Sequence, residues 1–350
     1  MTAESNAPHS VHLVGSMALP SVDAVFEATG TILGRRLKRV PDGEPGGRNL
    51  WISWQYPLLR ANPFLQADDD PQQVSSAGLK RVRIADGVAP EEVQFGELGY
   101  AREARTSYVD FTRARSKGLL DRKSRFQVCL PTPFAVVFPF VSKSSLATVE
   151  RAYEAAMIRE VEKICAEIPH GDLAIQWDLC IEMVMWNGEY ARYASPFADA
   201  KKEIIERVAR LCRAVPGDVE LGFHLCYGDW EAKHFVEPKD AGAMVDLANT
   251  LAASVGHPIA FMHMPVPIGR TDDAFFAPLE RLTLKPGTEL YLGLVHAADG
   301  VDGTKRRIAA ARKYASSFGV ATECGLGRCK KPDTVLDILR VHAGVSVEPN

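Results

Sequence analysis

A histidine and a cysteine stand two positions apart in the stretch 222–230, which reads "GFHLCYGDW". The apolar run before them predicts a strand over 219–228. Side chains two apart on a strand share a face, so His224 and Cys226 could bind one metal ion. Both could instead be core residues, because free cysteine is often buried. A motif of two residues does not decide between these interpretations.

Further ligands would have to come from other strands. Cys324 lies late in a predicted strand over 319–327, and His263 lies late in a predicted strand over 258–266. Two nitrogen and two sulfur ligands are typical of zinc. We therefore predict a Zn²⁺ site formed by His224, Cys226, Cys324 and His263.

The fourth ligand has alternatives. His234 and Glu237 lie just before the next predicted helix and could reach back in place of His263. Glu237 could equally be a charge at a helix N-terminus, where the helix dipole favours a carboxylate. The other cysteines are expected to pack in the core: Cys129, Cys165, Cys180, Cys212 and Cys329.

Polar side chains also end several other apolar runs. The candidate substrate-binding residues are Ser16, Glu44, Arg48, Gln176 and Asp178, and the candidate catalytic residues are His296 and Asp178. A carboxylate pair suits a polar or cationic group, and a histidine suits proton transfer. Taken singly, Glu44 could be a turn residue, Asp178 an internal ion-pair partner and His296 a solvent-facing side chain.

Eight strand–helix units would position these groups. The predicted strands cover 11–19, 37–44, 126–137, 173–183, 219–228, 258–266, 289–297 and 319–327. Nearly continuous apolar strands alternating with helices predict an α/β fold, a single (β/α)₈ TIM barrel, whose site lies at the carboxyl ends of the strands. A doubly wound open sheet is the alternative, although no glycine-rich nucleotide motif follows a strand. Residues 63–124 are polar and are expected to form an inserted cap between the second and third strands.

Bulk properties exclude several classes of protein. The 350 residues carry a net charge of −3 and no basic run, which argues against a nucleic-acid partner. The longest apolar run is 128–141, which is too short to cross a membrane and holds three prolines. No signal peptide is recognisable at the start, so we expect a cytoplasmic location. A small-molecule partner is expected, with monomer and homo-oligomer both open.

Six short motifs in order carry a resemblance that covers most of the chain. They are "HLVGS" (12–16), "DGEPGGR" (42–48), "IQWD" (175–178), "HLCYGD" (224–229), "LVHAADG" (294–300) and "ECGLGR" (323–328). The chain resembles the C-terminal catalytic barrel of cobalamin-independent methionine synthase, in the superfamily that also contains uroporphyrinogen decarboxylase and zinc alkyl-thiol transferases. The resemblance implies a zinc ion that binds a substrate thiol. It also implies that Glu44 and Asp178 hold the substrate amino group and that His296 donates or relays a proton.

Two departures from the family pattern change the expected chemistry. His263 stands where the family has a glutamate ligand, which would leave the zinc site neutral and more Lewis-acidic. The loop 132–140 has no tryptophan where the family stacks folate. Two cysteine ligands and the resemblance still favour a zinc-dependent transferase that moves an alkyl or methyl group to a thiol, which we expect, and folate use is open. The alternatives are a zinc lyase or hydrolase acting on a small carbonyl substrate, a non-catalytic zinc or ligand-binding barrel, and a metal-free decarboxylase-like barrel.

Overall fold

A curled sheet of seven parallel strands forms the centre of the molecule. The computed structural model describes residues 8, 10–75, 78–188, 196–228, 233–329 and 331–348. The strands run in the order β1 (Arg39–Pro41), β4 (Arg125–Pro131), β5 (Leu173–Leu179), β6 (Glu220–Leu225), β7 (Ile259–Pro265), β8 (Glu289–Val295) and β9 (Gly319–Thr322). Each strand pairs with the strand of this sheet that follows it along the chain, as successive β/α units require.

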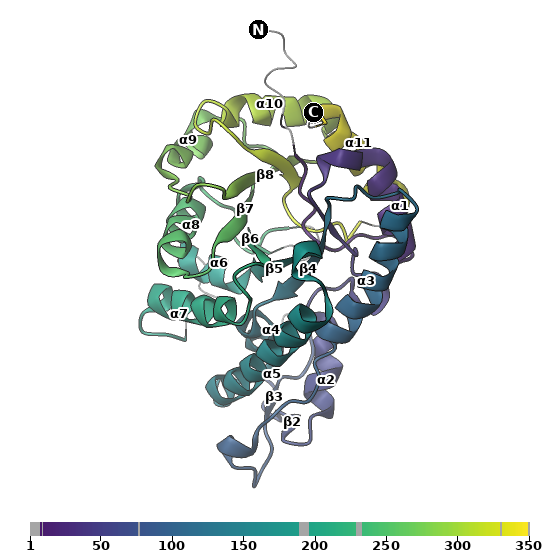
Figure 1. The fold of residues 1–350 in the computed structure, drawn as a ribbon. Coiled ribbons are helices and arrows are strands. Elements are labelled where there is room, and N and C mark those ends of the chain that lie inside the picture. Colours follow the sequence, from purple (N-terminus) through teal and green to yellow (C-terminus); the bar gives the residue numbers. More distant parts are fainter. Residues whose placement is uncertain are drawn as a thin grey trace.

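Helices surround this sheet (Figure 1). They are α1 (Val22–Leu33), α2 (Tyr56–Ala61), α3 (Tyr100–Ser116), α4 (Pro133–Phe140), α5 (Leu146–Glu167), α6 (Ile181–Asn187), α7 (Ala200–Arg213), α8 (Gly242–Ser254), α9 (Asp273–Phe276), α10 (Gly300–Ala311) and α11 (Pro332–Val345). Every residue of β5 is buried, because helices cover the outside of the strand and side chains from other strands fill the inside. None of the helices within the described ranges is both long and apolar enough to span a bilayer.

The first predicted strand is a connecting segment between the two edges of the sheet. Val11 forms isolated bridges both to Leu37, just before β1, and to Val320 in β9. Farther along, Met17 bridges to Leu326. Seven regular strands therefore form this sheet among the described residues, and the expected eighth is replaced by a segment whose backbone hydrogen bonds are divided between two neighbours.

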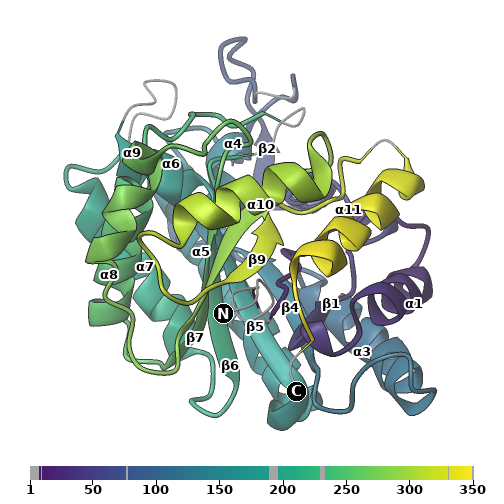
Figure 2. The same ribbon diagram turned by 90° about the horizontal axis from the view of Figure 1, so that it is seen from above.

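The segment 63–124 lies between β1 and β4. It contains the antiparallel pair β2 (Leu65–Ala67) and β3 (Val82–Ile84), which projects from the body (Figures 1 and 2), and α3, which packs against α1 and α5. The backbone N–H of Ser142, just after α4, donates to the carbonyl of Val82 at 2.9 Å. This contact ties the projecting pair to the chain that leaves α4, at the carboxyl end of the sheet.

Candidate metal centre

Three predicted ligands meet at the carboxyl end of the sheet. The ligand atoms of His224, Cys226 and Cys324 all lie within 4.8 Å of one another, and no other such group of three occurs in the described part of the chain. The two sulfur atoms are 3.8 Å apart. Two thiolates on a tetrahedral zinc, each bonded at about 2.3 Å, lie about 3.8 Å apart, so the spacing suits one ion.

The imidazole of His224 is oriented for a metal by His263. His263 Nε2 lies 3.0 Å from the carbonyl oxygen of Thr322, which can only accept, so Nε2 carries the proton. His263 Nδ1 must then accept from His224 Nδ1, 2.7 Å away. His224 Nε2 is left with a lone pair and no hydrogen-bond partner among the described residues. A buried nitrogen without a hydrogen-bond partner, beside two thiols, is an arrangement that a bound cation would satisfy.

Burial keeps the imidazole rings of His224 and His263 neutral, as the hydrogen bond between them requires. Desolvation, followed by the charges of His263 and His12, lowers the pKa of His224 well below its usual value. Desolvation also lowers the pKa of His263 to about 3. Neutral imidazole is the metal-binding form. His263, predicted as the fourth ligand, lies behind His224 with both nitrogens in hydrogen bonds, and its role as a ligand stays a prediction.

The local sequence brings the two cysteines to this point. His224 is paired with His263 across the β6–β7 ladder, and Cys226 follows directly after β6. The backbone N–H of Gly228 donates to the sulfur of Cys226 at 3.3 Å. Cys324 lies in the loop after β9, next to Gly325, where a Cβ would approach Ser16 Oγ to 2.3 Å. A side chain at position 325 would therefore require Ser16 to move where this loop packs against the N-terminal segment.

An open cavity with about 1120 Å³ of empty space lies over the three ligands. Of the predicted residues, Ser16, Glu44, Asp178, His224, Cys226 and Cys324 line it. Its remaining wall is largely apolar, with Leu50, Trp51, Phe140, Ile181 and Phe235. A cavity with one polar corner and an apolar wall suits a small molecule that carries both kinds of group.

Two carboxylates face this cavity, Glu44 and Asp178. Burial raises the pKa of Asp178 to about 7, although hydrogen bonds from Gln176 and Trp51 oppose that rise. Burial and then the charges of Asp42 and Asp178 raise the pKa of Glu44 well above its usual value. A cation in the cavity would relieve this repulsion and hold both groups ionised.

Gln176 lies beneath the cavity rather than in its wall. Its amide donates to Asp178 Oδ1 at 2.8 Å and to the carbonyl of Val14 at 2.6 Å, and its oxygen lies 2.8 Å from His12 Nε2. Gln127 Nε2 contacts the same oxygen at 3.3 Å. This buried network holds Asp178 in place. The sequence motifs did not reveal His12 and Gln127, although both are polar residues in apolar runs.

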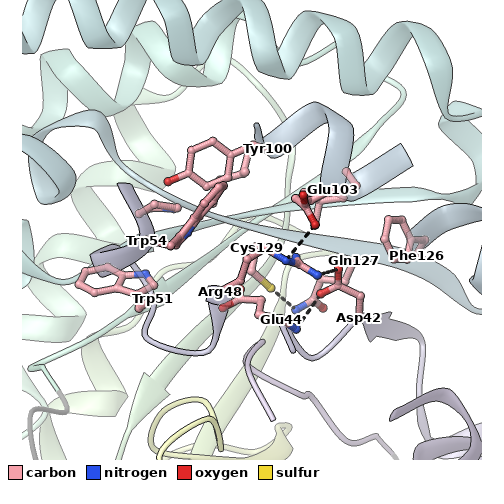
Figure 3. A pocket seen from close by; sticks show the side chains of 14 residues that line it. Asp42, Glu44, Arg48, Trp51, Trp54, Tyr100, Glu103, Phe126, Gln127 and Cys129 are labelled. Carbon is pink, nitrogen blue, oxygen red and sulfur yellow. Dashed lines mark hydrogen bonds and ion pairs between the residues drawn. The ribbon is translucent and has the colours of Figure 1, made fainter. Parts of the chain in front are cut away.

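Arg48 lies in a neighbouring pocket that shares Glu44 and Trp51 with the cavity (Figure 3). Its guanidinium pairs with Asp42 at 2.8 Å and with Glu103 at 3.4 Å. Figure 3 shows Arg48 between these carboxylates. Glu44 and Trp51 both have positive φ angles of 51° and 53°, a conformation that costs side-chain-bearing residues energy and is found at functional sites.

His296 is not among the residues that line the cavity. Its Nε2 lies 2.9 Å from the carbonyl of Val266, and its Nδ1 lies 3.5 Å from the carboxylate of Glu323. The same carboxylate is 3.5 Å from His234 Nε2, while His234 Nδ1 is 3.2 Å from Glu237. His234 and Glu237 are thus paired with each other outside the ligand cluster. Burial lowers the pKa of His296 to about 4.

The structure adds Cys180 and Trp51 to the site. Cys180 lines the cavity on the strand next to that of Cys226. The neighbouring thiol of Cys180 raises the pKa of Cys226 well above its usual value, with burial adding to the effect. The sequence did hold a signal for Cys180, because it stands two residues after Asp178 and so shares its face. Nothing in the sequence marked Trp51.

Comparison with known proteins shows which fold the chain shares with a solved structure. No family model and no curated protein matches the chain. A solved structure from Listeria monocytogenes, described as a candidate vitamin-B12-independent methionine synthase, is 14% identical and covers 96% of both chains with a TM-score of 0.59. A bifunctional proline utilization A protein reaches 12% identity over 71% of this chain and 24% of its own, and its TM-score of 0.34 carries no argument. The chain therefore shares the fold of the Listeria protein, and at this identity the likeness does not extend to activity.

Proposed function

We propose that this protein is a zinc-dependent enzyme on a (β/α)₈-like barrel, and that it activates a substrate thiol for alkyl or methyl transfer. The observation that carries the proposal is the orphan Nε2 of His224 beside two sulfur atoms 3.8 Å apart. Zinc held there would leave one position for a substrate thiol and lower its pKa. The description of the Listeria protein as methionine synthase-like agrees with this reaction class.

The residues around the ligands would bind and orient the substrate. Glu44 and Asp178 would hold a cationic amino group, since both carboxylates are buried and repel each other in its absence. Gln176 would keep Asp178 in position through the hydrogen bond from its amide to Asp178 Oδ1. The apolar wall with Leu50 and Phe140 would hold the alkyl donor away from water. His263 would hold His224 in the tautomer that leaves Nε2 available.

A Lewis-acid lyase or hydrolase is the second candidate. It is favoured by the donor set, because two thiolates and one neutral imidazole cancel the charge of Zn²⁺ and leave no excess negative charge. Such a centre would polarise a carbonyl group or a water molecule. The two candidates differ in whether a thiol enters the fourth position.

Metal analysis followed by X-ray absorption tests the proposal. The purified protein should hold one zinc per chain, and Cys226→Ser should lose it. The control variant Cys212→Ser, on α7 and away from the cavity, should retain it. Adding an aminothiol should raise the number of sulfur neighbours of zinc from that of the protein alone. Zinc retained by Cys226→Ser would show that the site is wrong, and an unchanged sulfur count would favour the lyase or hydrolase.

A further inference from the structure

Cys180 is a third thiol at the metal centre that the proposed reaction does not use. It directly follows β5, is 2% exposed and lines the same cavity as Cys226 and Cys324. It follows β5 just as Cys226 follows the neighbouring strand β6, yet it is not part of the compact ligand cluster. Cys180 therefore lies on the strand next to that of one ligand without being placed to share the ion.

The parallel ladder between β5 and β6 places Cys180 beside Cys226. Leu179 is paired with Leu225, and the N–H of Cys226 donates to the carbonyl of Leu179 at 3.0 Å. The next residue on each strand is one of the two cysteines. Neighbouring strands lie about 4.8 Å apart, which is inside the range of Cα separations, about 4.4–6.8 Å, that a disulfide needs. Rotation of the side chains would bring the two sulfur atoms together.

Cys324 is a poorer partner for a disulfide with Cys226. β7 and β8 separate β6 from β9, so the two side chains approach each other from strands that are not neighbours. Their sulfur atoms are 3.8 Å apart, a distance that two metal–sulfur bonds can span. A disulfide bond of about 2.05 Å would require the two sulfur atoms to leave this metal-binding spacing.

We propose that Cys180 and Cys226 form an oxidative modification site, at which a hydroperoxide produces a disulfide that removes Cys226 from the metal centre. The sulfur of Cys226 attacks the peroxide, the O–O bond breaks, and a sulfenic acid and one alcohol or water form. The sulfur of Cys180 then attacks that of Cys226. The S–S bond forms as the S–O bond breaks, and the departing hydroxide takes the thiol proton to leave as water. The peroxide gains the two electrons that the thiols lose, and a dithiol reductant reverses the reaction by two exchange steps.

Peptide mapping after hydrogen peroxide treatment tests this site. Trypsin places Cys226 in peptide 214–233, Cys180 in 164–192 and Cys324 in 314–328. The protein as purified and a chelator-treated sample are each oxidised, alkylated and digested without reduction. We expect peptide 214–233 linked to 164–192 in both samples, the loss of two free thiols per chain, and full recovery with dithiothreitol. The first sample should also release its metal to a chromogenic chelator as the link forms.

Two matched variants identify the partner, because peptide 164–192 also holds Cys165, which lies in α5 outside the cavity. The link should persist in Cys165→Ala and disappear in Cys180→Ala. A link from Cys226 to peptide 314–328, or irreversible oxidation of Cys226 without any link, would overturn the proposal. If Cys180→Ala does not fold, the peptide map of the oxidised wild-type protein and of Cys165→Ala still shows which peptide is linked to Cys226. Only the metal release rests on the proposed function, so a metal-free protein that still forms the link would separate the two proposals.

Discussion

Replacing His263 by phenylalanine should weaken zinc binding without removing a ligand. The change keeps a ring of similar size and removes the acceptor for His224 Nδ1 and the donor to the carbonyl of Thr322. Each buried polar atom left unpaired costs about 1–3 kcal/mol, so the free energy of unfolding should fall by about 2–6 kcal/mol. Losing the group that orients a metal-binding histidine typically weakens metal affinity by about 10–100-fold.

The measurement is zinc competition against a chromogenic chelator, together with urea unfolding of the chelator-treated protein. His342→Phe is the matched control, because His342 is equally buried, its ring nitrogen Nδ1 donates to the carbonyl of Ile338, and it lies in α11. It should lower stability by about 1–3 kcal/mol and leave zinc affinity unchanged. Equal zinc affinities in the two variants would refute the reasoning. Two imidazole neighbours around zinc in the wild-type X-ray absorption spectrum would instead make His263 a ligand.

Three further outcomes follow from the buried carboxylates and the metal. Burial raises the pKa of Glu182 to about 7, and the hydrogen bond from Thr132 opposes that rise. Between about pH 4.5 and 7 the folded protein therefore binds more protons at this residue than the unfolded chain does. The contribution of Glu182 to the free energy of unfolding therefore falls by about 3 kcal/mol as the pH rises through that range. Glu182→Gln should remove this part of the pH dependence measured by urea unfolding. An unchanged pH dependence would contradict a raised pKa at Glu182. Asp178→Asn should weaken binding of an aminothiol by about 10–100-fold relative to an alkanethiol of the same length, as measured by calorimetry. That loss should be larger at pH 8.5 than at pH 6, because Asp178 with a pKa of about 7 is ionised only at the higher value. Removing zinc with a chelator should lower the free energy of unfolding by about 2.7 kcal/mol, relative to a sample with free zinc at 100 times its dissociation constant. Identical urea midpoints for the two samples would argue against a metal that binds the folded state.

Local patterns predicted most of the sheet, because a strand covered on both faces leaves an apolar run with a polar residue at its end. Seven predicted strands are present in the main sheet for this reason, but two of them were predicted too long. The predicted strand 126–137 ends with β4 at Pro131 and continues as α4, and the predicted strand 173–183 ends with β5 at Leu179 and continues as α6. The exception is the segment with Val11, which the same pattern marked as a strand. Its backbone bonds to residues near Leu37 and Val320, and such a division depends on distant parts of the chain that no local pattern records.

The parts of the candidate site that depend on side-chain alternation along a strand could be predicted from the sequence. The parts that depend on hydrogen bonds between distant residues could not. Alternation placed His224 and Cys226 on one face, and the fold brought Cys324 to them. The position of His263 depends on the carbonyl of Thr322, from a strand that is not its neighbour in the sheet. The sequence identifies His263 as a possible ligand, but it does not show that both of its ring nitrogens form hydrogen bonds within the protein.

The divided pairing of the N-terminal segment also constrains when the protein can finish folding. Val11 and its partner Val320 are more than three hundred residues apart, so the two edges of the sheet join only after β9 exists. During synthesis the segment can pair near Leu37 but must wait for Val320 until the rest of the chain has emerged, and pairing at such a separation carries a large loop-closure cost. Closure of the ring is therefore a late, slow event, and it also completes the cavity, since the same segment supplies Ser16 to the wall.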